Sequence, residues 1–192
     1  WVLAKSRDGS KWNNYFKSLG AGYTIQLPET SAKITNAVMW QNTDPTSSVV
    51  YANGNQLDSN ESYVFYCFAE KTGYSKFGKF TSNGNADNTF VYCGFKPAWI
   101  MMKCDDTTDG WSKWYIFDTT RSPENMNVKE LEANSTAVES GNGADYAQID
   151  MLSNGFKLRN GSAWGPASSG KTNIFMAFAE EPLIGDNPAT AR

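Results

Sequence analysis

The 192-residue chain contains no histidine, and this absence removes several kinds of chemistry at once. Ser-His-Asp and Cys-His catalysis are excluded within the chain, because both use an imidazole as the general base. Zinc sites of the Cys2His2 type are excluded for the same reason. The commonest general base near neutral pH is therefore missing.

Cysteine is also scarce. The three cysteines, Cys67, Cys93 and Cys104, form no C-x-x-C pair, and their odd number leaves at least one thiol free. The count does not indicate a disulfide framework. Cys67 stands inside the apolar run YVFYCFA, so we expect a buried, unreactive thiol there. We expect neither a bound metal nor a cofactor.

Long apolar runs and clustered charge are missing too. No apolar stretch approaches the roughly 20 residues that cross a bilayer, so we expect no membrane insertion. The net charge is −3 and the Lys and Arg residues are scattered, which argues against a nucleic-acid partner. Aromatic residues, in contrast, make up 14% of the chain and indicate a sizeable packed core.

The remaining sequence is dominated by strand signals. Runs rich in Val, Ile, Tyr, Phe and Trp alternate with turns rich in Gly, Asn, Asp and Ser. Continuous apolar runs such as YVFYCFA predict central strands covered on both faces, and one short helix-like piece spans 127–134. The pattern predicts an all-β sandwich with antiparallel sheets. The predicted strands are 1–5, 12–16, 23–27, 63–69, 90–95, 99–104, 114–117, 155–159 and 173–179.

An internal repeat organises these strands. WVLAK at 1–5 matches WIMMK at 99–103, and SYVFYCFAE at 62–70 matches TNIFMAFAE at 172–180, in the same order. The matches predict two tandem homologous units, each sandwich-like or jelly-roll-like. We expect a first unit at 1–72, a second unit at 73–182 and a C-terminal tail at 183–192.

The opening of the second unit has no counterpart in the first. Residues 73–98 precede Trp99, whereas nothing precedes the matching Trp1, so we expect the chain to be a piece of a longer one. The first unit would lack its opening strands, and a missing strand leaves a bare sheet edge. The hypothesis is that another chain, or sequence absent here, covers this edge. A solution monomer whose edge strand stays exposed would contradict it.

The motifs also resemble a known family. The strings resemble a tandem β-rich repeat domain of structural proteins of marine tailed bacteriophages, described as tail-fibre or other virion surface proteins. The resemblance covers essentially the whole chain. It implies an oligomeric virion appendage of β-sandwich type with no known cofactor, and it transfers no catalytic or binding residue. The strings are YVFYCFAEKTGYSKFGKFTSNGNADNTFVYCGFKPAWIMMK, SNGFKLR, IFMAFAE, KSLGAG (17–22), DPTSSVV (44–50) and DTTRSP (118–123).

One segment carries a nucleotide-binding pattern. GPASSGKT at 165–172 matches G-x-x-x-x-G-K-[ST], which cradles phosphate when the loop leaves a strand and opens a helix. Here the preceding NGSAW is typical of a turn and the following NIFMAFA is typical of a buried strand. We interpret the segment as the polar turn before the last strand.

Acidic residues suggest two further sites. DDTTDG at 105–110 is similar to part of a calcium loop, but Thr107 and Ile116 stand where ligands are needed, so a hairpin turn is preferred. A polysaccharide depolymerase would need two carboxyl groups across a cleft. Glu70, Glu180 and Glu181 end the matched strands, and we interpret the recurring Glu70 and Glu180 as an architectural feature such as a strand-end salt bridge.

The seven tryptophans divide into two groups. Trp1 matches Trp99 and Trp12 matches Trp114, so these four are expected in the core, and Trp40 is expected to cap it. The unmatched loops around 105–111 and 160–170 are the expected presented surface, where aromatic rings stack on sugars or anchor proteins. The candidate contact or glycan-binding residues are Trp111, Trp164, Asp109 and Asn160.

The sequence therefore predicts a non-enzymatic structural component on a virion surface: a tail fibre, a spike or a capsid decoration. Its expected partners are other virion chains, including copies of itself, and a host-surface glycan or protein. Oligomer symmetry would multiply weak contacts into strong attachment. Two alternatives stay open, a glycan-binding lectin-like module and a polysaccharide depolymerase.

Overall fold

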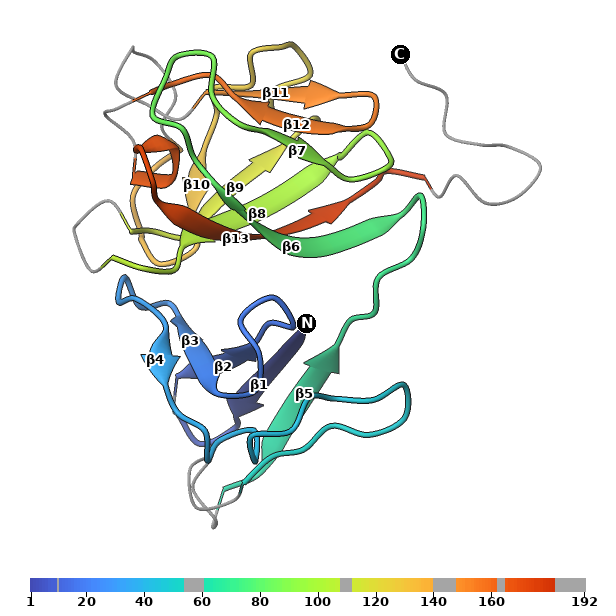
Figure 1. Cartoon of the computed structure of the whole chain (residues 1–192), viewed down its shortest axis with the longest axis vertical. Coiled ribbons are helices and arrows are strands. Elements are labelled where there is room, and N and C mark those ends of the chain that lie inside the picture. The colour runs from blue at the N-terminus through green and yellow to red at the C-terminus, as the bar shows by residue number, and fades with distance from the viewer. Residues whose placement is uncertain (10, 54–60, 108–111, 140–147, 162–164, 182–192) are drawn as a thin grey trace.

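The computed structural model describes residues 1–9, 11–53, 61–107, 112–139, 148–161 and 165–181 (Figure 1). Within these residues the regular secondary structure is almost entirely β-strand, and every strand pair is antiparallel. The predicted all-β class with antiparallel sheets is confirmed. The elements are β1 (Val2–Ser6), β2 (Trp12–Tyr15), β3 (Tyr23–Leu27), β4 (Ile34–Thr35), β5 (Tyr63–Cys67), β6 (Ser75–Thr81), β7 (Phe90–Tyr92), β8 (Trp99–Cys104), β9 (Tyr115–Asp118), β10 (Leu131–Glu132), β11 (Ile149–Leu152), β12 (Gly155–Leu158), the 3-10 helix η1 (Gly165–Ala167) and β13 (Thr172–Phe178).

The strands form three sheets. The first has the order β4-β3-β2-β1-β5 and occupies the lower half of Figure 1. The second has the order β10-β9-β8-β13-β6, and the third has the order β11-β12-β7. The second and third sheets enclose the largest core, as sandwich sheets do. That core consists of Phe80, Val91, Cys93, Phe95, Ile100, Met102, Tyr115, Phe117, Ile149, Met151, Phe156, Leu158, Ala167, Phe175, Ala177 and Ala179.

Strand β13 is covered on both faces. Its residues Phe175 and Ala177 point into the core between the second and third sheets, whereas Ile174 and Met176 point toward the first sheet. Successive side chains of a strand alternate between faces, so a strand between two layers is apolar at nearly every position. The prediction of a central strand from NIFMAFA is confirmed.

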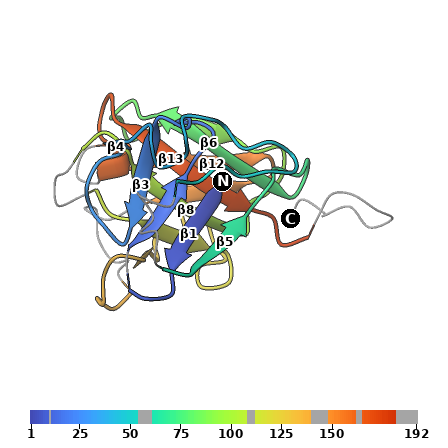
Figure 2. The same ribbon diagram turned by 90° about the horizontal axis from the view of Figure 1, so that it is seen from below.

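The first sheet packs on the outer side of the second. In Figure 2 its strands overlie β8 and β13, and a shared apolar cluster joins the two layers. Burial of a large apolar side chain stabilises by about 1.5–3 kcal/mol, so this interface holds the layers firmly. The buried members are Phe16, Ile25, Met101, Trp114, Ile174 and Met176, with Trp1, Leu19, Leu27, Phe77, Trp99, Ile116 and Phe178 partly buried around them.

The opposite face of the first sheet is covered by the segment 36–53. Trp40 from this segment is fully buried and lies edge-on to Tyr15, with ring centroids 5.9 Å apart. Val2 and Ala4 of β1 belong to the same cluster. The expectation that Trp40 caps the core is confirmed.

The two copies of the sequence repeat occupy matching places in their sheets. Val2 pairs with Cys67 across β1 and β5, and Ile100 pairs with Ala177 across β8 and β13. These positions are 100 − 2 = 98 and 177 − 67 = 110 residues apart, the same two spacings that separate the matched sequences. One flanking strand also corresponds, since β2 lies beside β1 as β9 lies beside β8.

The matched tryptophans share their surroundings as well. The Lys5 ammonium lies 5.9 Å from the centroid of the Trp12 ring, and the Lys103 ammonium lies 5.8 Å from that of Trp114. These are cation–π distances. Trp114 is fully buried and Trp12 is partly buried, so the same lysine–tryptophan contact occurs once in the core and once closer to the surface.

Two local expectations differ from the structure. The helix-like piece at 127–134 is not a helix: Asn127 bridges Ile149 and the segment ends in β10, which pairs with β9. Two backbone hydrogen bonds between Asn127 and Ile149 fix this extended path. Strands β4, β6 and β11, together with β10 in the helix-like piece, are present although none was among the predicted strands.

Candidate functional site

The nucleotide-like pattern GPASSGKT does not form a phosphate cradle. Strand β13 begins at Thr172, where a phosphate-binding loop would open a helix. The Thr172 N–H donates to the Asp106 carboxylate at 3.1 Å, and the Lys171 ammonium lies 3.9 Å from the same carboxylate. Asn173 donates to the Pro166 carbonyl at 2.8 Å and closes the turn. The interpretation as a polar turn before the last strand is confirmed.

The predicted contact loops are only partly described. Trp111, Asp109 and Trp164 lie outside the described residues. Asn160 is half-buried, and its carbonyl accepts a hydrogen bond from the Asn88 amide at 3.2 Å. The glycan-binding prediction for these four residues therefore stays a prediction.

Glu70 follows β5 and contacts residues of β6. Its carboxylate accepts from the Phe77 N–H at 3.0 Å and lies 3.3 Å from the Lys76 ammonium. Glu180 is exposed at the end of β13. No group of three or more Cys, Asp or Glu side chains in the described parts of the chain is arranged to hold a metal ion.

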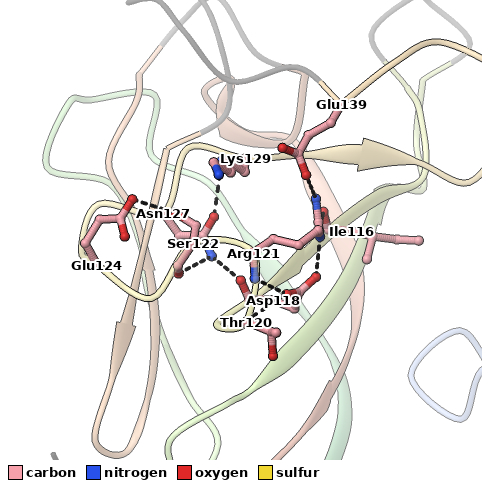
Figure 3. A network of polar contacts seen from close by, with 9 residues as sticks. All are labelled: Ile116, Asp118, Thr120, Arg121, Ser122, Glu124, Asn127, Lys129 and Glu139. Atoms are coloured by element: carbon pink, nitrogen blue, oxygen red, sulfur yellow. Dashed lines mark hydrogen bonds and ion pairs between the residues drawn. The ribbon is translucent and has the colours of Figure 1, made fainter.

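The DTTRSP segment forms a network of polar contacts around Arg121 (Figure 3). The Asp118 carboxylate accepts from the backbone N–H groups of Thr120 and Arg121, and the Arg121 guanidinium also binds Glu139 and the Ile116 carbonyl. Burial would raise the pKa of Asp118, but these donors outweigh it and hold that pKa below its usual range. These contacts tie β9 to the loop that follows it, and we interpret the network as structural.

A second polar network lies between the first and second sheets. The fully buried Lys103 ammonium donates to the Ser112 hydroxyl at 2.9 Å and to the Thr30 carbonyl at 3.2 Å. Lys33 pairs with buried Asp105 at 3.0 Å. Burial raises the pKa of Asp105 in spite of this partner. The first sheet is thus held to the second by polar as well as apolar contacts.

Strand β5 presents an exposed apolar surface. It lies at the edge of the first sheet and has one strand neighbour, β1. Val64, Phe65, Tyr66 and Phe68 are 39%, 39%, 44% and 36% exposed. The prediction that YVFYCFA is covered on both faces is wrong for this strand, because side chains on both of its faces are exposed and no second strand lies beside it among the described residues.

The thiol of Cys67 shares this exposure. The prediction of a buried, unreactive Cys67 is wrong, since Cys67 is exposed whereas Cys93 and Cys104 are buried. Burial raises the pKa of the Cys93 and Cys104 thiols to about 12. The physical reason for the difference is again the position of β5 at the edge of its sheet.

The backbone of β5 also faces outward. Trp1 and Phe68 exchange two backbone hydrogen bonds, and the Arg7 N–H donates to the Ser62 carbonyl. Bonded and non-bonded pairs alternate along an antiparallel ladder. The N–H and C=O groups of Phe65 and Cys67 therefore point away from β1, toward the open edge.

The edge of the second sheet at β6 is protected by comparison. The outward N–H of Phe77 donates to the Glu70 carboxylate, and the Thr81 carbonyl accepts from the Thr89 hydroxyl at 2.8 Å. Lys79 is exposed on the same strand. Side-chain contacts and lysines are devices that discourage further strand pairing. Strand β5 lacks such a lysine and presents aromatic side chains instead.

The fold and this edge define an all-β protein of three antiparallel layers with an apolar strand open at one side. Residues 1–182 match the family described as "Domain of unknown function (DUF7483)", and the chain belongs to that family. No curated protein and no solved structure matches the chain significantly. Among the residues placed by the structure, no helix has the length and apolar character to cross a membrane.

Proposed function

We propose that the chain is a non-enzymatic structural component of a phage virion, exposed at the particle surface and joined to neighbouring chains through β5. The observation that carries the proposal is the apolar, outward-facing edge of β5. A strand edge of this kind accepts another strand by main-chain hydrogen bonding, with side chains adding specificity. The virion setting rests on the motif resemblance described above.

The proposal includes a duplicated architecture. We infer that residues 1–72 and 73–182 are homologous units of one jelly-roll-like repeat, and that β6 and β7 have no counterpart among the described residues of 1–72. The matching registers of β1 with β5 and of β8 with β13 support this inference. The segment 36–53 then takes the place of a second sheet over the first unit.

Assembly through such edges suits an attachment protein. Rigid sheets present loops at fixed positions, and repeated copies bring many weak contacts to one surface. The proposed partners are other virion chains, including further copies of this unit, and a host-surface glycan or protein. This role requires no turnover of substrate by the chain.

The virion assignment is tested on particles of the phage that encodes the chain. Antibodies raised against the 192-residue protein are applied to purified, intact virions and imaged by immunogold electron microscopy. Label at the tail, fibres or capsid surface is the expected result. Peptides from the chain that are abundant in infected cells but missing from purified virions by mass spectrometry would contradict the proposal.

A further inference from the structure

The occupant of the β5 edge can be inferred from the equivalent edge of the second sheet. Strand β13 corresponds to β5 in the repeat, and its side away from β8 is filled by β6. The β13–β6 ladder is antiparallel and continuous over seven residue pairs, from Thr172↔Thr81 to Phe178↔Ser75. The molecule therefore already contains one strand that fits an edge of this kind.

The fit between β13 and β6 depends on a glycine. Gly78 of β6 lies directly opposite Phe175, and a Cβ added to Gly78 would lie 2.9 Å from the Phe175 ring. The aromatic ring thus lies over bare backbone of the neighbouring strand. In β5 the equivalent position is Phe65, which pairs with Ala4 as Phe175 pairs with Met102. The same aromatic side chain is present, but its ring is 39% exposed.

We propose that the open edge of β5 accepts one antiparallel strand with the residue pattern of β6, SKFGKFT, carried by a further copy of the segment 73–98 whose strand is not already paired with a β13. In the inferred register the incoming glycine lies opposite Phe65, and the residue equivalent to Lys76 lies opposite Cys67. The outward N–H and C=O groups of Phe65 and Cys67 provide the hydrogen bonds. The inference rests on the proposed function, because it names the partner of that assembly edge.

The side chains on both faces of β5 support a partner strand with alternating apolar residues. On one face Phe65 pairs with Ala4, which belongs to the cluster under the segment 36–53. On the other face Phe68 stacks on Trp1 with ring centroids 4.3 Å apart. An incoming phenylalanine on each side of the glycine would extend both layers. The edge of β6 itself is a poor partner, because its outward Phe77 N–H and Thr81 carbonyl are already bonded.

The repeat also provides the segment with which the inference can be tested. Residues 73–98 lead directly into Trp99, the counterpart of Trp1, so a copy of this segment can be fused in front of Trp1 without a designed linker. A control fusion carries valine at the position of Gly78 in the added segment only. Both proteins keep the original 192 residues unchanged.

Two readouts are measured for the parent chain, the fusion and the control. The fusion is expected to melt about 5 °C or more above the parent. Its Cys67 is expected to react with a maleimide about tenfold more slowly, because the added strand covers it. The control fusion is expected to lose most of both effects, since its valine collides with Phe65.

The inference is overturned if the fusion and its valine control behave alike in both readouts. It is also overturned if the parent chain is a dimer in which Cys67 is already protected, because the occupant would then be a second β5. Labelling of virions by antibodies does not depend on either outcome. Failure of this inference is therefore distinguishable from failure of the proposed function.

Discussion

Strands β5 and β13 have the same place in the repeat but opposite surroundings. Each is an apolar strand of similar sequence that pairs antiparallel with a tryptophan-led strand, β1 or β8, in the same register. β13 has a second neighbour and a sheet on each face, whereas among the described residues β5 has neither a second neighbour nor complete cover. The comparison shows that the apolar sequence of a strand indicates the surroundings for which the strand is suited. It does so even where some of those surroundings are not present.

The largest expected difference between the two strands is in the stability contributed by their matched phenylalanines. Phe175 is buried among Phe80 and Phe156, with centroids 6.1 and 5.4 Å away. Phe175→Ala should lower the free energy of unfolding by about 3–5 kcal/mol. Phe65→Ala should change it by less than about 1 kcal/mol, because its ring is already partly in water. Urea unfolding of both variants measures the contrast, and equal losses would contradict it.

A smaller effect is expected at the glycine beneath Phe175. Gly78→Val should destabilise the chain by about 1–3 kcal/mol, because the new side chain overlaps the Phe175 ring. Gly22→Ala is the matched control, since its added Cβ would meet only the Asn42 side chain at an ordinary 3.7 Å. Thermal melts of the two variants check the prediction. A Gly78→Val protein as stable as the parent would show that β6 and β13 do not need the glycine.

Thiol reactivity tests the exposure of the β5 edge without changing stability. In the folded chain at pH 8, Cys67 should react with a maleimide at least about 100-fold faster than Cys93 and Cys104. The cause is exposure of Cys67 at the edge, together with the burial that raises the pKa of the other two thiols to about 12. Mass spectrometry of labelled peptides gives the three rates. Similar rates for Cys67 and Cys93 would mean that the β5 edge is covered.

The smallest expected effect concerns the buried carboxylate that links the first and second sheets. Burial raises the pKa of Asp105 in the folded chain above its unfolded value of about 3.9. The folded state then binds a proton more tightly, so this group's contribution to stability falls as the pH rises from about 4 through the folded pKa. Asp105→Asn should remove that part of the pH dependence. Urea unfolding across pH 4–7 measures it, and an unchanged slope in the variant would contradict the assignment.

Much of the fold follows from the sequence, because strand signals are local. All nine predicted strands lie on observed strands, and the repeat indicated that β1 and β8 would have matching partners. Strand β6 escaped prediction because Gly78 and Lys79 separate its two phenylalanines and leave neither an apolar run nor an alternation; that glycine is explained only by the opposing Phe175 ring. The 127–134 segment has helix-forming residues, but its partner Ile149 is distant in sequence.

The candidate site was harder to predict for a physical reason. The sequence repeat indicated a bare edge on the first unit, yet the apolar run YVFYCFA by itself indicated a covered strand with a buried Cys67. Apolar residues favour burial but cannot reveal whether a neighbouring strand is present. Trp111 and Trp164 were predicted as contacts because they lie in polar turns with no match in the other repeat copy, whereas the outward backbone of Phe65 and Cys67 depends on pairing with β1.

The most direct test of the account is amide hydrogen exchange at Phe65 and Cys67, measured in the parent chain and in the fusion that carries residues 73–98 before Trp1. The matching amides of Phe175 and Ala177 serve as internal references within β13. The account predicts fast exchange at Phe65 and Cys67 in the parent, and exchange as slow as at Phe175 and Ala177 in the fusion. Slow exchange in the parent monomer, or no change in the fusion, would contradict it.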